Sequence, residues 1–195
     1  MWTRNFDVDA VVQRTASFLF RRILLAALVL VVPVLAAQTV ENRRLTWADF
    51  KGTPEAASPY DAFTRWSVRY EYDAPERTPE GLRLHFRVWN RLDERSWVKE
   101  NTPREHQKAE LLNHEQGHYS LGVICALSFK KTASTYQFTS DYQAETARLF
   151  TETLERVRAL ELAYDAETRH MYDRNQQRAW DAKLQQMIQE LWVYR

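Results

Sequence analysis

The chain has 195 residues, of which 45% are hydrophobic and 13% aromatic, and it carries 27 Lys and Arg against 26 Asp and Glu. This apolar and aromatic content excludes a disordered protein, and the length suits one domain with a substantial core plus a short additional segment. The balanced charge argues against a nucleic-acid partner.

An apolar run near the N-terminus predicts export. Arg21 and Arg22 precede a run of 15 residues, Ile23 to Ala37, which is interrupted only by Pro33. This run is shorter than the ~20 residues of a membrane-spanning helix but is typical of a signal peptide. We therefore expect residues 1–37 to be a signal peptide or an uncleaved signal anchor. The protein would then be periplasmic, secreted or attached to the membrane through residues 18–37.

Alternating patterns in the next part of the chain predict a small antiparallel sheet. Apolar and polar side chains alternate along residues 65–72 and 82–90, with turn residues from Pro75 to Gly81 between them. This arrangement is typical of a β-hairpin with one buried face. A further short strand is expected at Ser96–Val98. The Trp and Phe of Leu45–Gly52 should pin the start of the domain to the core.

The second half of the chain is expected to form three long helices. Thr102–Glu105 is a capping box with Pro at the first helical position, which marks the start of the first helix. The predicted helices run from about Pro103 to Thr132, from Thr139–Asp141 to Leu162, and from Asp165 or Thr168 to Trp192. Strands followed by helices, without an intervening linker, predict a single α+β domain over residues 38–195.

The first of these helices contains His114, Glu115 and His118 in the pattern H-E-x-x-H. Residues four apart on a helix lie on the same side, so both imidazoles can reach one metal ion. Two neutral His nitrogens, a third protein ligand and a water molecule are typical of a catalytic zinc site. Glu115 would take a proton from that water and pass it to the leaving amine. The motif therefore predicts a zinc hydrolase with Zn²⁺ as its cofactor.

Two further residues of this helix are informative. Gly117, between the two His, lowers helix propensity by roughly 1 kcal/mol, which indicates that something approaches the backbone closely. Cys125 is the single cysteine, so an intrachain disulfide is excluded. We expect it to be a small core residue rather than a metal ligand.

Several separated segments resemble one family. These segments are Leu45–Gly52, Ser96–Val98, Leu112–His118 and Tyr164–His170. Together they resemble the domain of unknown function 922 family, regarded as predicted zinc-dependent proteases of secreted or envelope type. The resemblance spans nearly all of residues 45–195. It implies a zincin-like metallopeptidase domain that acts on a peptide or protein substrate.

The chain departs from the family pattern at one position. That pattern places Gly directly after His170, where this chain has Met171. It also has a Gln and a Trp further on, and this chain carries Gln176, Gln177 and Trp180 there. The local backbone after His170 is therefore where this chain can differ from its relatives.

The third zinc ligand is expected from the segment Tyr164–His170. We predict His170, which lies 52 residues after His118, where a helix can fold back and bring it to the metal. Asp165 is the rival as a carboxylate ligand, with a helix N-cap as its other role. The remaining candidates are Glu145, His85 and His106.

The sequence offers candidates for two further parts of the site and one alternative function. Tyr164 or Tyr172 can donate to a developing oxyanion, and an edge strand at Trp66–Tyr72 or Ser96–Val98 can bind an extended peptide. The alternative function is a non-catalytic envelope binding or scaffold protein with a structural or vestigial metal site. Stoichiometric zinc distinguishes the enzyme from a plain scaffold, and peptidase assays distinguish a catalytic from a structural metal.

Overall fold

The computed structural model describes residues 39–100 and 107–195, and it combines helices with small antiparallel sheets, which confirms the α+β class. Three long helices follow the strands in this part of the chain: α1 (Lys108–Thr135), α2 (Tyr142–Thr168) and α3 (Arg174–Leu191). None of the helices in the described ranges is long and apolar enough to cross a membrane. The proposed signal segment and the capping box before α1 lie outside the described residues.

The strands pair in three two-stranded antiparallel sheets within the described ranges. In chain order they are β1 (Ala62–Phe63), β2 (Trp66–Tyr72), β3 (Glu76–Thr78), β4 (Gly81–Arg83), β5 (Phe86–Leu92) and β6 (Trp97–Val98). The long ribbon pairs β2 with β5, β3 pairs with β4 at its end, and β1 pairs with β6. The predicted hairpin is confirmed, and its turn region carries a small strand pair of its own.

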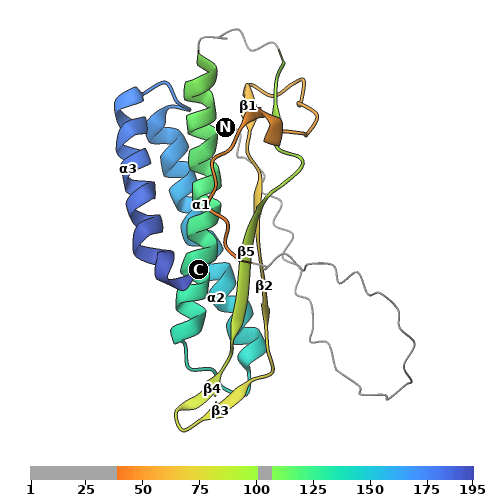
Figure 1. Cartoon of the computed structure of the whole chain (residues 1–195), viewed down its shortest axis with the longest axis vertical. Coiled ribbons are helices and arrows are strands. Elements are labelled where there is room, and N and C mark those ends of the chain that lie inside the picture. Colours follow the sequence, from red (N-terminus) through yellow and green to blue (C-terminus); the bar gives the residue numbers. More distant parts are fainter. Residues whose placement is uncertain (1–38, 101–106) are drawn as a thin grey trace, which may run out of the picture.

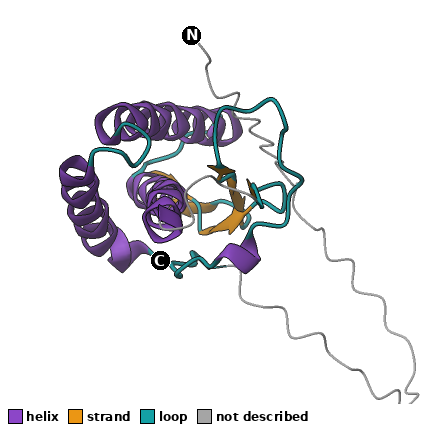
Figure 2. Cartoon of the chain, turned by 90° about the horizontal axis from the view of Figure 1, so that it is seen from above, coloured by secondary structure: helices purple, strands orange, loops and turns teal. Residues whose placement is uncertain are grey.

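Helix α1 runs through the middle of the molecule. Helices α2 and α3 pack against it on two sides, and the β2–β5 ribbon covers another (Figures 1 and 2). Nearly every side chain from His114 to Phe129 is buried. The spacing of apolar residues predicts one buried face, but residues 119–129 are apolar or small around the whole helix, which is the pattern of a helix buried on all sides.

The N-terminal part of the domain is held against α1 as the sequence predicts. Phe50 is buried and Trp47 packs against the core. The Gln116 side chain adds two hydrogen bonds: it accepts from the backbone N–H of Leu45 at 2.7 Å and donates to the carbonyl of Arg43 at 3.2 Å. A residue within the H-E-x-x-H motif thus also anchors the start of the domain.

Helix α2 is longer than predicted, and α3 begins later. No Gly or Pro interrupts the chain after Leu162, so α2 continues to Thr168 and includes Asp165. Asp165 is therefore not a helix N-cap. The cap of α3 is Asp173, whose side chain accepts hydrogen bonds from two backbone N–H groups of the first turn.

A strained turn follows α2. Arg169, His170 and Met171 have φ values of 50°, 53° and 76°. Residues with a side chain adopt this left-handed region at a cost of roughly 1–2 kcal/mol each. The value at Met171 explains why Gly suits this position in the family pattern. Such strain is concentrated at functional sites, and His170 is the middle residue of the turn.

Gly117 allows α2 to approach α1 closely. The hydroxyl of Tyr164 donates to the backbone carbonyl of His114 at 2.9 Å, so the phenol lies directly against the α1 backbone. A Cβ atom at position 117 would overlap the phenol oxygen. This contact is the close approach that a Gly within the motif indicates.

We predict that Gly117→Ala destabilises the protein by about 1–3 kcal/mol, because the added methyl forces Tyr164 away from the helix. In an ordinary helix interior the same change gains up to about 1 kcal/mol, so the sign is diagnostic. Urea unfolding monitored by circular dichroism measures the difference. Ser134→Ala, at an exposed position of α1, is the control and should change stability by less than about 0.5 kcal/mol. A Gly117→Ala variant as stable as the wild type would contradict the packing described here.

Candidate metal centre

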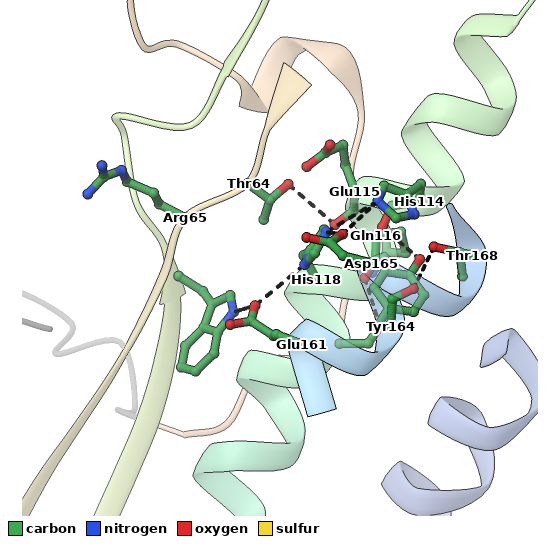
Figure 3. Close-up of polar contacts among 12 residues, drawn as sticks. Thr64, Arg65, His114, Glu115, Gln116, His118, Glu161, Tyr164, Asp165 and Thr168 are labelled. Atoms are coloured by element: carbon green, nitrogen blue, oxygen red, sulfur yellow. Dashed lines mark hydrogen bonds and ion pairs between the residues drawn. The ribbon is translucent and has the colours of Figure 1, made fainter. Parts of the chain in front are cut away.

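Three side chains bring their ligand atoms together inside the protein. The Nε2 atoms of His114 and His118 lie 3.3 Å apart, and Asp165 Oδ1 lies 3.2 Å from the first and 3.0 Å from the second. The two His are one turn apart on α1, and Asp165 comes from the end of α2. Figure 3 shows the three side chains pointing toward one another. All three are buried, so this His-His-Asp group is enclosed by protein.

The spacing of these atoms fits a metal ion. Zinc binds nitrogen at about 2.0–2.1 Å and carboxylate oxygen at about 2.0–2.2 Å, so two ligand atoms of a tetrahedral site lie about 3.3 Å apart. The three separations in the His-His-Asp group are 3.3, 3.2 and 3.0 Å. Two imidazoles with one carboxylate also form a donor set that suits a divalent transition ion. The His-His-Asp group can therefore hold a metal ion.

Each His has an acceptor beside the ring nitrogen that faces away from this group. His114 Nδ1 lies 3.1 Å from Gln177 Oε1 on α3, and His118 Nδ1 lies 3.5 Å from Glu161 Oε1 on α2. An acceptor at Nδ1 favours the tautomer with its proton there, which leaves the Nε2 lone pair for a metal. Two lone pairs that face each other at 3.3 Å repel, and a cation between them removes the repulsion.

The electrostatic environment favours the metal-binding forms of these groups. Burial, the largest influence, lowers the pKa of His114 below its ordinary value, so the imidazole is neutral at pH 7. Burial alone would raise the pKa of Asp165, but His118 and His114 beside it lower the pKa below its ordinary value. Metal ions bind neutral imidazole and ionised carboxylate, which are the forms that these shifts favour for His114 and Asp165.

Two more carboxylates are buried around the group. Glu161 is 1% exposed, and its Oε1 accepts a hydrogen bond from the Trp66 indole N–H at 2.9 Å. Glu115 is also 1% exposed, and its Oε2 makes no hydrogen bond to the described residues. Figure 3 shows Asp165 and Glu161 both pointing toward His118. Carboxylates buried beside two imidazoles supply oxygen and nitrogen donors that suit a divalent cation.

A pocket of about 350 Å³ gives access to this region. Its walls are residues 59–62, which lead into β1, three residues of α1 (Leu111, His114 and Glu115), and residues 170–172 of the strained turn. The pocket therefore ends at Glu115 and His114, which are only 1% and 2% exposed. The walls away from these two residues are largely apolar.

His170, the predicted third ligand, is placed differently from Asp165. Its Nδ1 lies 3.4 Å from Asp165 Oδ1, its side chain is 43% exposed, and its ring packs against Tyr60 at a centroid distance of 5.2 Å. It is not part of the His-His-Asp group. In this position His170 can orient the Asp165 carboxylate, and the geometry favours Asp165 as the third donor.

The other candidate ligands lie elsewhere. Glu145 accepts hydrogen bonds from Thr139 at the start of α2, and exposed His85 lies 3.4 Å from Glu76 on the β3–β4 side. Cys125 is a core residue, as predicted, and burial raises the pKa of its thiol to about 12. His106 lies outside the described residues.

The two tyrosines considered as oxyanion donors have different surroundings. The Tyr164 ring stacks on His114 at 4.8 Å, and its hydroxyl proton is directed to the His114 carbonyl. Burial raises the pKa of this phenol well above its ordinary value. Tyr164 therefore supports the α1 backbone, whereas Tyr172 is 54% exposed and lines the pocket.

Glu161 and Gln177 lie beside the His rings, and the sequence does not identify either of them as a residue of the site. Glu161 lies four residues after Val157 and four before Asp165, so it occupies the buried stripe of α2. A charged residue within an apolar stripe is a signal that could have revealed it. Gln177 is one of two residues, with Gln176, that can correspond to the Gln of the pattern that the chain resembles, and that pattern assigns it no role at His114.

A model of the family described as "Bacterial protein of unknown function (DUF922)" matches residues 38–171 of the chain. The match covers more than half of the chain and ends within the strained turn. No curated protein and no solved structure matches the chain significantly.

We predict that Asp165→Asn lowers zinc affinity more than His170→Ala does, because the first change weakens a ligand and the second removes a group that orients it. Loss of such an outer partner costs ~10–100-fold in affinity, so His170→Ala should fall in or below this range. Competition with a chromophoric chelator measures both constants. Glu155→Gln, an exposed carboxylate change on α2, is the matched control. Full zinc occupancy in Asp165→Asn together with an empty His170→Ala protein would move the third ligand to His170.

Proposed function

The chain belongs to the DUF922 family of bacterial proteins, and we propose that it is a zinc-dependent metallopeptidase. The observation that carries this proposal is the position of Glu115. Its side chain is next to His114 in sequence, lines the same pocket, and keeps one carboxylate oxygen without a hydrogen bond to the described residues. A metal site that only stabilises the fold has no need of such a carboxylate at the wall of a pocket.

The proposed ion is Zn²⁺, with His114, His118 and Asp165 as its protein ligands. Three protein ligands leave a position open, as in catalytic zinc sites. When bound, zinc supplies a Lewis acid that polarises a peptide carbonyl and lowers the pKa of a water molecule. His170 would hold the Asp165 carboxylate in place from the side of the pocket, at 3.4 Å.

Glu115 is the proposed general base and acid. Its carboxylate accepts the proton of the attacking water and donates it to the nitrogen of the leaving amine. The backbone at this residue is fixed by the Thr64 hydroxyl, which donates to the Glu115 carbonyl at 3.3 Å. The proposed donor to the carbonyl oxygen of the substrate is the phenol of Tyr172, which lines the pocket and is 54% exposed.

The proposed substrate is a peptide or protein. The pocket walls combine mainly apolar surface with the side chains of Glu115 and His114, which suits a peptide whose side chain is bound while its backbone reaches the metal. This proposal also agrees with the zincin-like fold that the family resemblance implies. We propose that the protein acts outside the cytoplasm, because of the apolar run after Arg22.

Glu115→Gln is predicted to keep stoichiometric zinc and to lose at least ~100-fold in peptide hydrolysis, since the amide retains the shape but cannot accept the proton. Zinc content by mass spectrometry and turnover of a fluorogenic peptide library measure the two properties. Glu155→Gln, an exposed carboxylate change on α2 that is not part of the pocket wall, is the control and should keep both zinc and activity. A wild-type protein that binds zinc but cleaves no peptide would favour the non-catalytic envelope protein instead.

Export is tested with a reporter. Residues 1–45 fused to alkaline phosphatase, which folds only outside the cytoplasm, should give active enzyme in a bacterial host. The same fusion with Leu24→Arg and Leu28→Arg should not, because two charges interrupt the apolar run. Export is rejected if the alkaline phosphatase fusion is inactive while residues 1–45 fused to a reporter that works only in the cytoplasm give an active protein. The mass of the native product would distinguish cleavage from anchoring.

A further inference from the structure

A chain of hydrogen bonds links helix α3 to the metal centre. Gln177 Oε1 lies 3.1 Å from His114 Nδ1, and Gln177 Nε2 donates to Asp181 Oδ1 at 2.8 Å. Asn113 Nδ2 in turn donates to Asp181 Oδ2 at 2.8 Å. We infer that Asp181, acting through the Gln177 amide, fixes the tautomer in which His114 presents its Nε2 lone pair to the metal.

The orientation of the Gln177 amide decides which nitrogen of His114 carries the proton. With Oε1 toward His114, Nδ1 is the donor and Nε2 is bare. If the amide were rotated by 180°, its NH₂ group would face Nδ1 and the proton would move to Nε2. That proton would point at His118 Nε2, 3.3 Å away, where a metal ligand needs a lone pair. Only one amide orientation is therefore compatible with metal binding.

Two partners select this orientation. A carboxylate only accepts hydrogen bonds, so Asp181 requires the NH₂ group of Gln177, whereas rotation would place two acceptor oxygens 2.8 Å apart. The Tyr164 hydroxyl uses its proton for the His114 carbonyl, so it also accepts from Gln177 Nε2, at 2.8 Å. Gln177 is buried, so rotation would leave polar groups that water cannot easily satisfy.

Asp181 is a positioning residue, since its contacts on this path are with Gln177 and Asn113. Together with Asn113 it lines a second pocket, of about 530 Å³, between α1, α3 and residues 42–45. Because Asp181 is only partly buried, a change there does not open the core. Helix α3 begins after the matched residues 38–171, so part of the support for the metal centre comes from beyond the family match.

The first test is the affinity of the full chain for Zn²⁺, measured by chelator competition. Asp181→Asn should lower it about tenfold, because an amide can present either an oxygen or an NH₂ group to Gln177. The double change Asp181→Asn with Asn113→Asp should restore it, since the carboxylate at the outer end again selects the amide orientation. Glu190→Gln, an exposed carboxylate change on α3, should have no effect. Wild-type affinity in Asp181→Asn would overturn the inference, as would a double variant no better than the single one.

The second test observes the His114 Nδ1 proton directly. In the zinc-loaded full chain, ¹⁵N–¹H NMR should show a proton on His114 Nδ1 that exchanges slowly with solvent, because Gln177 Oε1 lies 3.1 Å away and accepts it. In Asp181→Asn this exchange should become faster, and in the double variant it should become slow again. A rapidly exchanging Nδ1 proton in the wild type, or unchanged exchange in Asp181→Asn, would overturn the inference. Because this measurement does not involve hydrolysis, a zinc-bound protein that shows the slowly exchanging proton but cleaves no peptide would contradict only the proposed function.

Discussion

The Nε2 atoms of His114 and His118, on the buried helix α1, lie 3.3 Å apart, and Asp165 Oδ1 lies 3.2 Å from the first and 3.0 Å from the second. This arrangement is the constraint on which the surrounding structure depends. Gln177 Oε1 lies 3.1 Å from His114 Nδ1 and Glu161 Oε1 lies 3.5 Å from His118 Nδ1, so both Nε2 lone pairs can be directed toward the same point. Three buried carboxyl groups surround that point. Such a cluster is unfavourable without a cation, because buried charges and lone pairs of one kind repel each other.

The fold holds this cluster by packing three elements around α1. Gly117 admits the phenol of Tyr164 to the helix backbone, and Gly122 gives room to the Trp66 ring, whose indole N–H holds Glu161. One contact comes from α2 and the other from β2. Helix α3 adds Gln177. A metal ligand is therefore oriented by side chains from several separate parts of the chain, which is how a site becomes rigid enough to select its ion.

The sequence predicts the local features well. The spacing of His114 and His118 places both rings on one side of α1, and the alternating residues before it give the β2–β5 hairpin. The end of α2 is harder to predict, because nothing between Leu162 and Thr168 breaks a helix and the turn beyond it uses left-handed residues without Gly. The choice between Asp165 and His170 depends on that turn, since both belong to the same motif.

The sequence does not show which side chains from distant segments contact one another. Glu161, Gln177 and Trp66 meet around the His rings only because α2, α3 and β2 pack on α1, and no local pattern records which side chains touch across those interfaces. Glu161 is a partial exception, since a carboxylate in the buried stripe of α2 indicates a partner. Gly117 is a second partial exception, because it indicates a close approach to the backbone, although not which residue makes that approach.

The central claim is that His114, His118 and Asp165 bind one zinc ion. X-ray absorption at the zinc edge of the zinc-loaded full chain measures the ligand set directly. We predict two imidazole nitrogens at about 2.0–2.1 Å, with carboxylate and water oxygens completing the shell at about 2.0–2.2 Å. A shell with three imidazoles would place His170 on the metal in contradiction to the geometry described here, and a shell without imidazole scattering would show that the His-His-Asp group does not bind zinc at all.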